Sequence, residues 1–236
     1  LEKTIEEQLS QLHRTEQLRR YVSPQVADAI VNEGSPVTLA PTRRNLTILI
    51  SDIRGFTEMS ERMEPEELVD ALNQYFGSMT DVVFSHGGTL DKYLGDGILA
   101  FFGEPIPFED HAERAVATAF DMQSGLDRLR DLWMIQYEEE LAIGIGISTG
   151  YVTVGNIGSA DRIDYTVIGN HVNLASRLAT SASSGQVLVT DRTLAAVRDQ
   201  VEATEVESLT LKGVQRPVRV FEIKQRVSAP RIDGGV

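Results

Sequence analysis

Two aspartates at expected turns of the chain are the strongest candidates for chemistry, because paired carboxylates can hold divalent metal ions. Asp52 follows the β-branched run NLTILIS (45–51), and Asp96 lies between two glycines in LGDG (94–97). If a βαβ-type return brings both to one edge of a sheet, they could bind two Mg²⁺ or Mn²⁺ ions about 3.5–4 Å apart, an arrangement used for in-line attack at phosphorus. Mg²⁺ favours one or two carboxylates plus substrate phosphates. The alternative is that Asp96 only forms a turn and Asp52 only begins a loop.

Three further polar residues could contact a phosphorylated substrate. Asn173 and Arg177 stand at positions i and i+4 of a predicted short helix, so both lie on one face, where they could orient a ribose and neutralise a phosphoryl group. Lys92 precedes Asp96 in the same predicted hairpin, and regular alternation would place both on one side of the strand. A solvated helix face and an exposed strand lysine are the alternatives.

Other catalytic motifs are absent or fail their structural requirement. Residues 146–150 read GISTG and fit the GxSxG pattern of serine hydrolases, but that motif needs a strand, a sharp turn and a helix. The β-rich stretch 151–158 follows instead, and only His171 remains downstream to act as a base. The sequence contains no HExxH motif, no P-loop and no cysteine, which excludes zinc knuckles, disulfides and cysteine nucleophiles.

The composition is that of an acidic globular chain. Of its 236 residues, 42% are hydrophobic and 24% charged, which allows a substantial core and excludes bulk disorder. A net charge of −13 would repel a polyphosphate backbone, so no nucleic-acid partner is expected. No apolar run could cross a bilayer and no secretory signal opens the chain, so we expect a cytoplasmic fragment without membrane contact. It begins at Leu1 rather than Met, which predicts an excised piece of a longer protein, one that could itself be membrane-attached.

Apolar spacing predicts three regions: helices and a linker over 1–44, a globular domain over 45–225, and a tail over 226–236. The first helix is amphipathic and could pair with a second copy. The domain begins with the order βαββαβ and adds C-terminal strands, which indicates an α+β, ferredoxin-like (palm-like) sandwich. The predicted elements are a strand at 45–52, a helix from Pro65 to the Gly87-Gly88 pair, a hairpin over 89–103, a helix from Asp110 with Glu113 completing a capping box, a strand within 141–158, a helix over 170–183, QVLVT (186–190), a helical turn over 191–198, and strands near 200–206 and 217–224.

Four spaced blocks resemble the signature of the class III adenylate/guanylate cyclase catalytic domain, in the same order along the chain. They are SDIRGFT (51–57), LDKYLGDGILAFFG (90–103), YTVIGNHVNLASRL (165–178) and LTLKGVQRPVRVFEI (209–223). The resemblance covers roughly residues 45–224, and several spaced matches are far more specific than any single motif. Residues 22–31 also resemble the short helical transducer that often precedes these domains.

The resemblance implies a metal-binding role for one group of residues. Asp52 and Asp96 match the two metal-binding aspartates of the family, with the Ile53 carbonyl as a further ligand. The implied cofactors are two divalent ions, Mg²⁺ or Mn²⁺. Phe56 and Thr57, in the same block as Asp52, are expected to contact the substrate.

A second group is implied to bind the nucleotide. Lys92 and Thr166 match the pair that reads the purine, and Asn173 and Arg177 match the ribose-orienting asparagine and the transition-state arginine. Lys212 matches a lysine that contacts the terminal phosphates in some members. Family sites form between two chains, with the aspartates from one and the base-reading and arginine residues from the other. One chain carrying both sets implies a head-to-tail homodimer with two equivalent sites.

The expected activity is the conversion of ATP to 3′,5′-cyclic AMP and pyrophosphate, in cyclic-nucleotide signalling. Thr166 stands where many adenylate cyclases carry Asp, and a hydroxyl can accept from the adenine 6-amino group. Lys92 only donates, which suits adenine N1, and the Glu and Cys usual in guanylate-specific members are absent. The alternatives are a guanylate cyclase or a silent nucleotide-sensing dimer. We expect an upstream sensory domain outside these residues.

Overall fold

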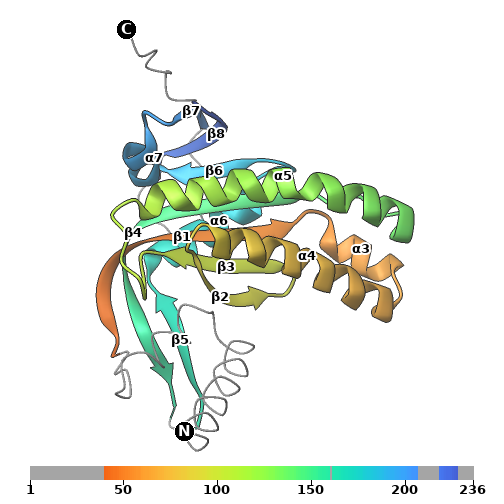
Figure 1. Cartoon of the computed structure of the whole chain (residues 1–236), viewed down its shortest axis with the longest axis horizontal. Coiled ribbons are helices and arrows are strands. Elements are labelled where there is room, and N and C mark those ends of the chain that lie inside the picture. The colour runs from red at the N-terminus through yellow and green to blue at the C-terminus, as the bar shows by residue number, and fades with distance from the viewer. Residues whose placement is uncertain (1–39, 160, 207–217, 228–236) are drawn as a thin grey trace, which may run out of the picture.

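A mixed β-sheet runs through the computed structural model, which describes residues 40–159, 161–206 and 218–227. Within these residues the sheet has eight strands in the order β2-β3-β1-β4-β6-β8-β7, with β5 paired to β4 (Figure 1). The strands are β1 (Thr42–Ile53), β2 (Thr89–Leu94), β3 (Gly97–Phe102), β4 (Ile143–Gly158), β5 (Ile163–Ile168), β6 (Val187–Thr190), β7 (Val201–Val206) and β8 (Val220–Arg226). The helices are α3 (Phe56–Arg62), α4 (Pro65–Ser85), α5 (His111–Tyr137), α6 (Asn170–Ser181) and α7 (Asp191–Val197).

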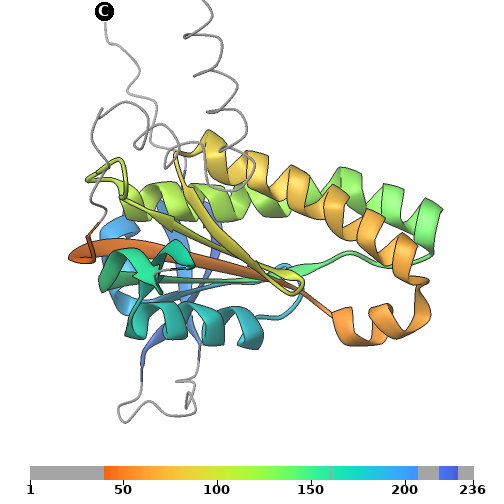
Figure 2. The same ribbon diagram turned by 90° about the horizontal axis from the view of Figure 1, so that it is seen from below.

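Helices cover both faces of the central strands. The long helices α4 and α5 lie on one face and α6 lies on the other, as the view in Figure 2 makes plain. In β1, Leu49 belongs to the core cluster beneath α4 and α5, whereas Ile48 and Ile50 belong to the cluster beneath α6. Burial on both faces explains why this strand reads as a continuous apolar run rather than an alternating one.

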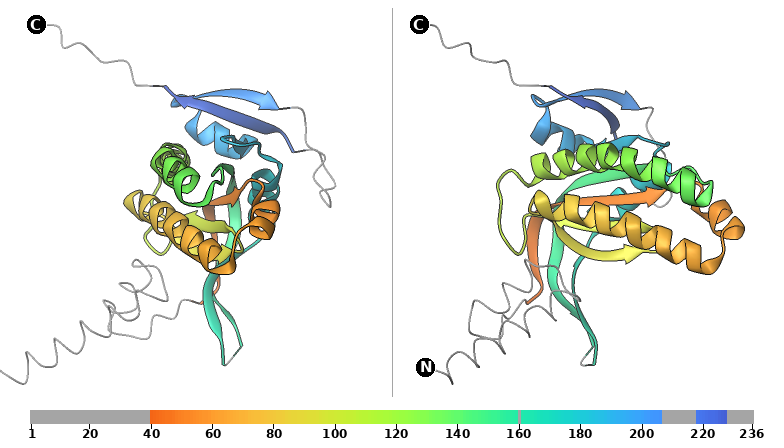
Figure 3. Two further views of the ribbon diagram at one scale, coloured as in Figure 1. Left: turned by 90° about the vertical axis from the view of Figure 1, so that its right-hand side faces the viewer. Right: turned by 45° about the vertical axis from the view of Figure 1, so that its right-hand side comes forward.

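The β4–β5 pair extends away from the helices as a two-stranded arm (Figures 1 and 3). Ile163 and Ile168 on β5 are 57% and 55% exposed, and Tyr151 on β4 is 53% exposed. The arm therefore presents apolar side chains that the residues described by the structure leave exposed.

Most of the predicted elements are observed, which confirms the α+β class and the palm-like sheet. The helix beginning at Pro65, the 89–103 hairpin and the 143–158 strand lie where the apolar spacing placed them. Two elements, α3 and β5, were not predicted. The predicted helices within 1–33 lie outside the described residues, and no described helix is long and apolar enough to span a membrane.

Two local predictions were wrong. The first strand begins at Thr42 rather than Asn45, because residues placed in the linker pair with β4, where Thr42 is opposite Val154. The predicted capping box at Asp110 does not form. The carboxylate of Asp110 instead accepts a hydrogen bond from Arg114 Nε at 2.8 Å, a pairing along one face of the helix.

Glycines in β4 allow α6 to pack directly on the strand backbone. A Cβ added at Gly146 would lie 2.2 Å from the Ala175 carbonyl oxygen and 2.4 Å from the Ala179 amide nitrogen. Both contacts are to helix backbone, so a larger residue would displace the helix that carries Asn173 and Arg177.

We therefore expect Gly146→Ala to destabilise the protein by about 1–3 kcal/mol, the usual cost of overpacking. Thermal unfolding measures this. Gly77→Ala is the matched control, because a Cβ at Gly77 in α4 meets nothing within 4 Å. The control should be neutral or stabilising, because alanine is the better helix former. Equal unfolding temperatures for the Gly146→Ala variant and the wild type would contradict the close approach.

Candidate active site

The two predicted metal-binding aspartates meet at one edge of the sheet. Asp52 lies near the end of β1, and Asp96 lies in the tight turn between β2 and β3. Strand β3 pairs antiparallel with β1, which brings this turn to the end of β1. The Asp96 Oδ2 atom accepts a hydrogen bond from the Ile53 amide at 3.1 Å. Gly97 permits this approach, because a Cβ there would lie 2.8 Å from the Ser51 carbonyl oxygen.

The charges at this edge suit a divalent cation. Burial raises the pKa of Asp96 above its usual value, and the neighbouring negative charge of Asp52 raises it further. A cation between the two carboxylates would relieve this repulsion, and paired carboxylate oxygens with a backbone carbonyl are ligands that Mg²⁺ accepts. The described residues contain no group of three or more acidic, histidine or cysteine side chains that could hold a metal. A metal site here would therefore use the two carboxylates, with the remaining ligands supplied by backbone and substrate oxygens.

An open pocket surrounds the carboxylates and collects one of the two predicted sets. Five predicted residues line it together: Asp52, Ile53, Phe56, Thr57 and Asp96. Three residues that the sequence analysis did not single out complete it: Arg54, Gly55 and Glu58.

Lys92 and Thr166 also meet, at a different place on the sheet. Lys92 Nζ donates to Thr166 Oγ1 at 3.2 Å, although the two residues are 74 positions apart. Asp91 joins them: its carboxylate accepts from the Thr166 hydroxyl at 2.7 Å and from the Val167 amide at 3.2 Å, and lies 3.1 Å from Lys92 Nζ. The Asp91 side chain is 1% exposed, so this buried carboxylate fixes both predicted base-reading side chains.

A bulge in β2 explains why Asp91 escaped the sequence analysis. Regular alternation would point Asp91 and Lys92 to opposite faces, but the register with β3 shifts between Leu90 and Lys92. The bulge lets neighbouring side chains reach the same threonine. The shift lies before Lys92, and β2 pairs regularly with β3 from Lys92 to Leu94, so the alternation expected between Lys92 and Asp96 is not affected by it. A buried-strand position occupied by aspartate is the signal that could have found Asp91.

Asn173 and Arg177 occupy one face of α6, as predicted. Asn173 is exposed and Arg177 is half-buried, and neither side chain makes a hydrogen bond or ion pair with any residue that the structure describes. Neither lines the carboxylate pocket. Among the described residues, Asn173 and Arg177 thus lie apart from the carboxylate pocket. Lys212 lies outside the described residues.

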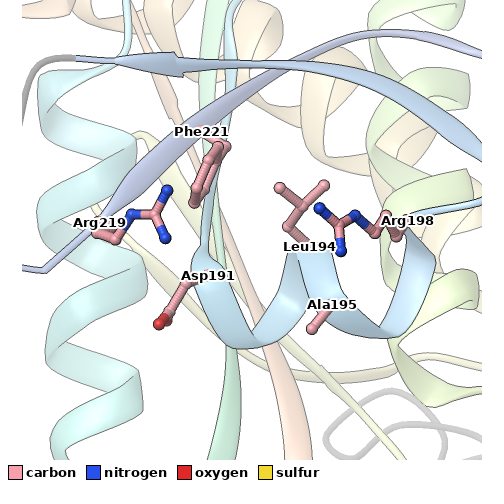
Figure 4. Close-up of a pocket in the computed structure, with 6 residues that line it drawn as sticks. All are labelled: Asp191, Leu194, Ala195, Arg198, Arg219 and Phe221. Carbon is pink, nitrogen blue, oxygen red and sulfur yellow. The ribbon is translucent and has the colours of Figure 1, made fainter.

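The remaining candidates do not join the site. Ser148 is fully buried in the middle of β4, where its hydroxyl bonds to His171 Nδ1 at 2.9 Å, so the GxSxG segment forms no nucleophile elbow. Another pocket lies between α7 and β8, with Arg198 and Arg219 on either side of Phe221 (Figure 4). None of the predicted site residues lines that pocket, and Arg219 is already paired with Glu205 at 2.8 Å.

The fold and the two residue sets define a nucleotide cyclase catalytic domain. Residues 39–225 match the family model of the adenylate and guanylate cyclase catalytic domain, so the chain belongs to this family. The adenylate cyclase of Anabaena cylindrica is 36% identical over 201 residues, which are 81% of this chain and 39% of that protein. Adenylate cyclase 1 of Rhizobium meliloti is 29% identical over 205 residues, or 31% of its length. The chain thus spans less than half the length of these relatives.

Solved structures of both kinds of cyclase resemble the chain. The adenylyl cyclase CyaB from P. aeruginosa matches with a TM-score of 0.76 and 39% identity, over 82% of this chain and 98% of that one. The guanylyl cyclase Cya2 matches with a TM-score of 0.75 and 42% identity, over 81% and 97%. Overall similarity therefore leaves the choice of purine to the site residues.

Proposed function

We propose that this chain is an adenylate cyclase whose active sites are shared between two copies of the chain. The observation that carries the proposal is the separation of the two residue sets. None of the predicted base-reading or ribose-orienting residues lines the carboxylate pocket, and Asn173 and Arg177 have no hydrogen-bond or ion-pair partner among the residues that the structure describes. A head-to-tail homodimer would bring the pocket of one copy against the second set of its partner. The exposed apolar side chains of the β4–β5 arm offer surface for that contact.

In the proposed reaction, the 3′-hydroxyl of ATP gives up its proton to the solvent, and its oxygen attacks the α-phosphorus in line. The bond from the α-phosphorus to the bridging oxygen breaks, and pyrophosphate leaves. Asp52, Asp96 and the Ile53 carbonyl would hold two divalent ions, Mg²⁺ or Mn²⁺. Such ions, when bound, lower the pKa of the attacking hydroxyl and offset phosphate charge. Asn173 orients the ribose, and Arg177 offsets the negative charge that develops on the α-phosphate. Phe56 and Thr57 contact the substrate beside the carboxylates, and Lys212 contacts the terminal phosphates.

The contacts of Thr166 support adenine over guanine. Its hydroxyl proton is donated to Asp91, so toward a ligand the oxygen can only accept. Adenine presents a donor, the 6-amino group, where guanine presents an acceptor, O6. Lys92 supplies a donor for adenine N1, whereas N1 of guanine is protonated. Guanylate cyclase is the second candidate, favoured by the resemblance to Cya2.

Asp91→Asn tests this account of the purine choice. An asparagine amide can face the threonine as either donor or acceptor, so the hydroxyl loses its fixed orientation. We expect the ratio of kcat/KM for ATP to that for GTP to fall about tenfold, the effect of one well-placed hydrogen bond. Asp127→Asn, at an acid 73% exposed on α5, is the control and should leave the ratio unchanged. An unchanged ratio in the Asp91 variant would exclude this role.

Mixing two impaired variants tests the shared site. Asp96→Asn removes the metal half of a site, and Arg177→Ala removes the arginine half. Each variant alone is impaired at both sites, but a mixed dimer holds one complete site. We expect cyclic AMP and pyrophosphate to form far faster from the mixture than from either variant alone. Failure to recover activity in mixed dimers, verified by light scattering, would contradict a site built from two chains.

A further inference from the structure

The Arg54 guanidinium donates hydrogen bonds both to Asp52 and to the C-terminal end of α6, which belong to different parts of the proposed site. Nη1 donates to the carbonyl oxygens of Thr180 and Ala182, at 3.1 Å each. Nε and Nη2 donate to the Asp52 carbonyl oxygen at 3.4 and 3.3 Å, and Nη2 also pairs with the Asp52 carboxylate. The side chain is 19% exposed, so these contacts are partly shielded from water.

The fold places the end of α6 within reach of Asp52. Asp52 is directly opposite Gly144 in the pairing of β1 with β4. A Cβ on Gly144 would lie 2.9 Å from Ala182 Cβ and 3.0 Å from the Ala182 carbonyl oxygen. Because Gly144 has no side chain, the C-terminal end of α6 can pack directly beside Asp52.

Arg54 also supplies a charge that α6 lacks. The last turn of this helix contains no basic residue, although the carbonyl groups at a helix C-terminus attract cations. The backbone of Arg54 is itself fixed, because its amide donates to the Ala142 carbonyl oxygen at 2.8 Å. The guanidinium thus fixes the position of the C-terminal end of α6 relative to Asp52.

We propose that Arg54 is a positioning residue that couples the two active sites of the dimer. The inference rests on the shared site proposed above. In that arrangement, Asp52 serves one site, while Asn173 and Arg177 on α6 of the same chain serve the other. Arg54 therefore joins the metal half of one site to the arginine half of the next. The two halves are joined through this one side chain.

Mixed dimers separate the two ends of this link. One chain carries Arg177→Ala and supplies the metal half of the single complete site; the other carries Asp96→Asn and supplies α6. Arg54→Gln is then placed on one chain or the other. On the metal-supplying chain, we expect the Mn²⁺ concentration for half-maximal rate to rise about tenfold, because Asp52 loses its orienting partner. On the helix-supplying chain, we expect kcat to fall about tenfold with the Mn²⁺ dependence unchanged.

Arg54→Lys provides a second variant that keeps the positive charge. Lysine is shorter and carries its donors on one nitrogen, whereas Arg54 reaches the helix carbonyls through Nη1 and the Asp52 carboxylate through Nη2, so we expect lysine to keep Asp52 and lose the helix carbonyls. This variant should therefore be nearly silent on the metal-supplying chain and should lower kcat on the helix-supplying chain. Arg62→Gln is the matched control. Arg62, the last residue of the neighbouring α3, forms a similar two-pronged pair with Glu139, and its replacement should change neither quantity.

Hydrogen exchange of the metal-free protein gives a readout independent of activity. In Arg54→Gln, we expect faster exchange of the amides at the end of α6, where Ala182 N donates to the Leu178 carbonyl oxygen, and no change in Arg62→Gln. Effects on both chains, with this faster exchange, support the link. An effect on one chain only, on neither, or unaltered exchange would overturn it. If the parental pair itself recovers no activity, the shared-site proposal fails first and the coupling falls with it.

Discussion

Replacing Asp96 with asparagine is expected to reduce cyclisation by about 10³-fold while making the metal-free protein more stable at neutral pH. The activity falls because a bound metal supplies several kcal/mol of transition-state stabilisation, and each 1.36 kcal/mol is tenfold in rate. The fold survives because the asparagine oxygen can still accept from the Ile53 amide, as the carboxylate does at 3.1 Å.

The stability gain follows from the direction of the pKa shift. Burial and the charge of Asp52 raise the pKa of Asp96 in the folded state above its unfolded value. Ionisation of Asp96 therefore costs stability, which is lost as pH rises from the unfolded pKa through the folded one. Asparagine removes this cost. Unfolding in EDTA at pH 4 and pH 7 measures it: the advantage of the variant should be larger at pH 7. A variant that is less stable than the wild type at pH 7 would contradict the inference that ionised Asp96 destabilises the metal-free fold.

Arg177→Ala is expected to lower kcat by about 10²–10³-fold, the typical loss on removing one preorganised group that stabilises developing charge. KM for ATP should change much less, because the arginine acts chiefly in the transition state. Its side chain has no hydrogen bond or ion pair with the described residues, so the free energy of unfolding should stay within about 0.5 kcal/mol.

This combination separates a catalytic role from a structural one. Arg128→Ala, at an exposed arginine on α5, is the control and should change neither kcat nor stability. If Arg177→Ala raised KM with kcat unchanged, the arginine would bind substrate without stabilising the transition state. A large loss of stability would instead indicate that Arg177 supports the fold.

The sequence predicted the elements that carry their own periodic signal. The predicted apolar positions of α4 recur at helical spacing: Met79 and Val83 are buried, and Leu68, Leu72 and Phe76 are partly buried against the same core. Helix α3 has only seven residues and buries only Met59, so no period could reveal it. Strand β5 is largely exposed and exists through its pairing with β4, which no local pattern specifies.

The pairing of Asp52 with Asp96, which we propose to bind metal, was predicted from their positions after a strand and within a turn, together with the signature blocks. Asp91 and Arg54 were missed because their roles depend on contacts with distant segments. Thr166 lies 75 positions from Asp91, and Thr180 lies 126 positions from Arg54. Spacing rules describe neighbours along a strand or helix, so partners at such distances appear only in the folded chain.

The most direct test of the proposed adenylate cyclase is the product formed from equal concentrations of ATP and GTP with Mn²⁺, separated by chromatography. We predict cyclic AMP as the dominant product, which would support both the activity and the reading of adenine by Lys92 and Thr166. Cyclic GMP as the dominant product would contradict the purine assignment while retaining the carboxylate site. The absence of both products from a folded, metal-loaded dimer would contradict the enzyme itself.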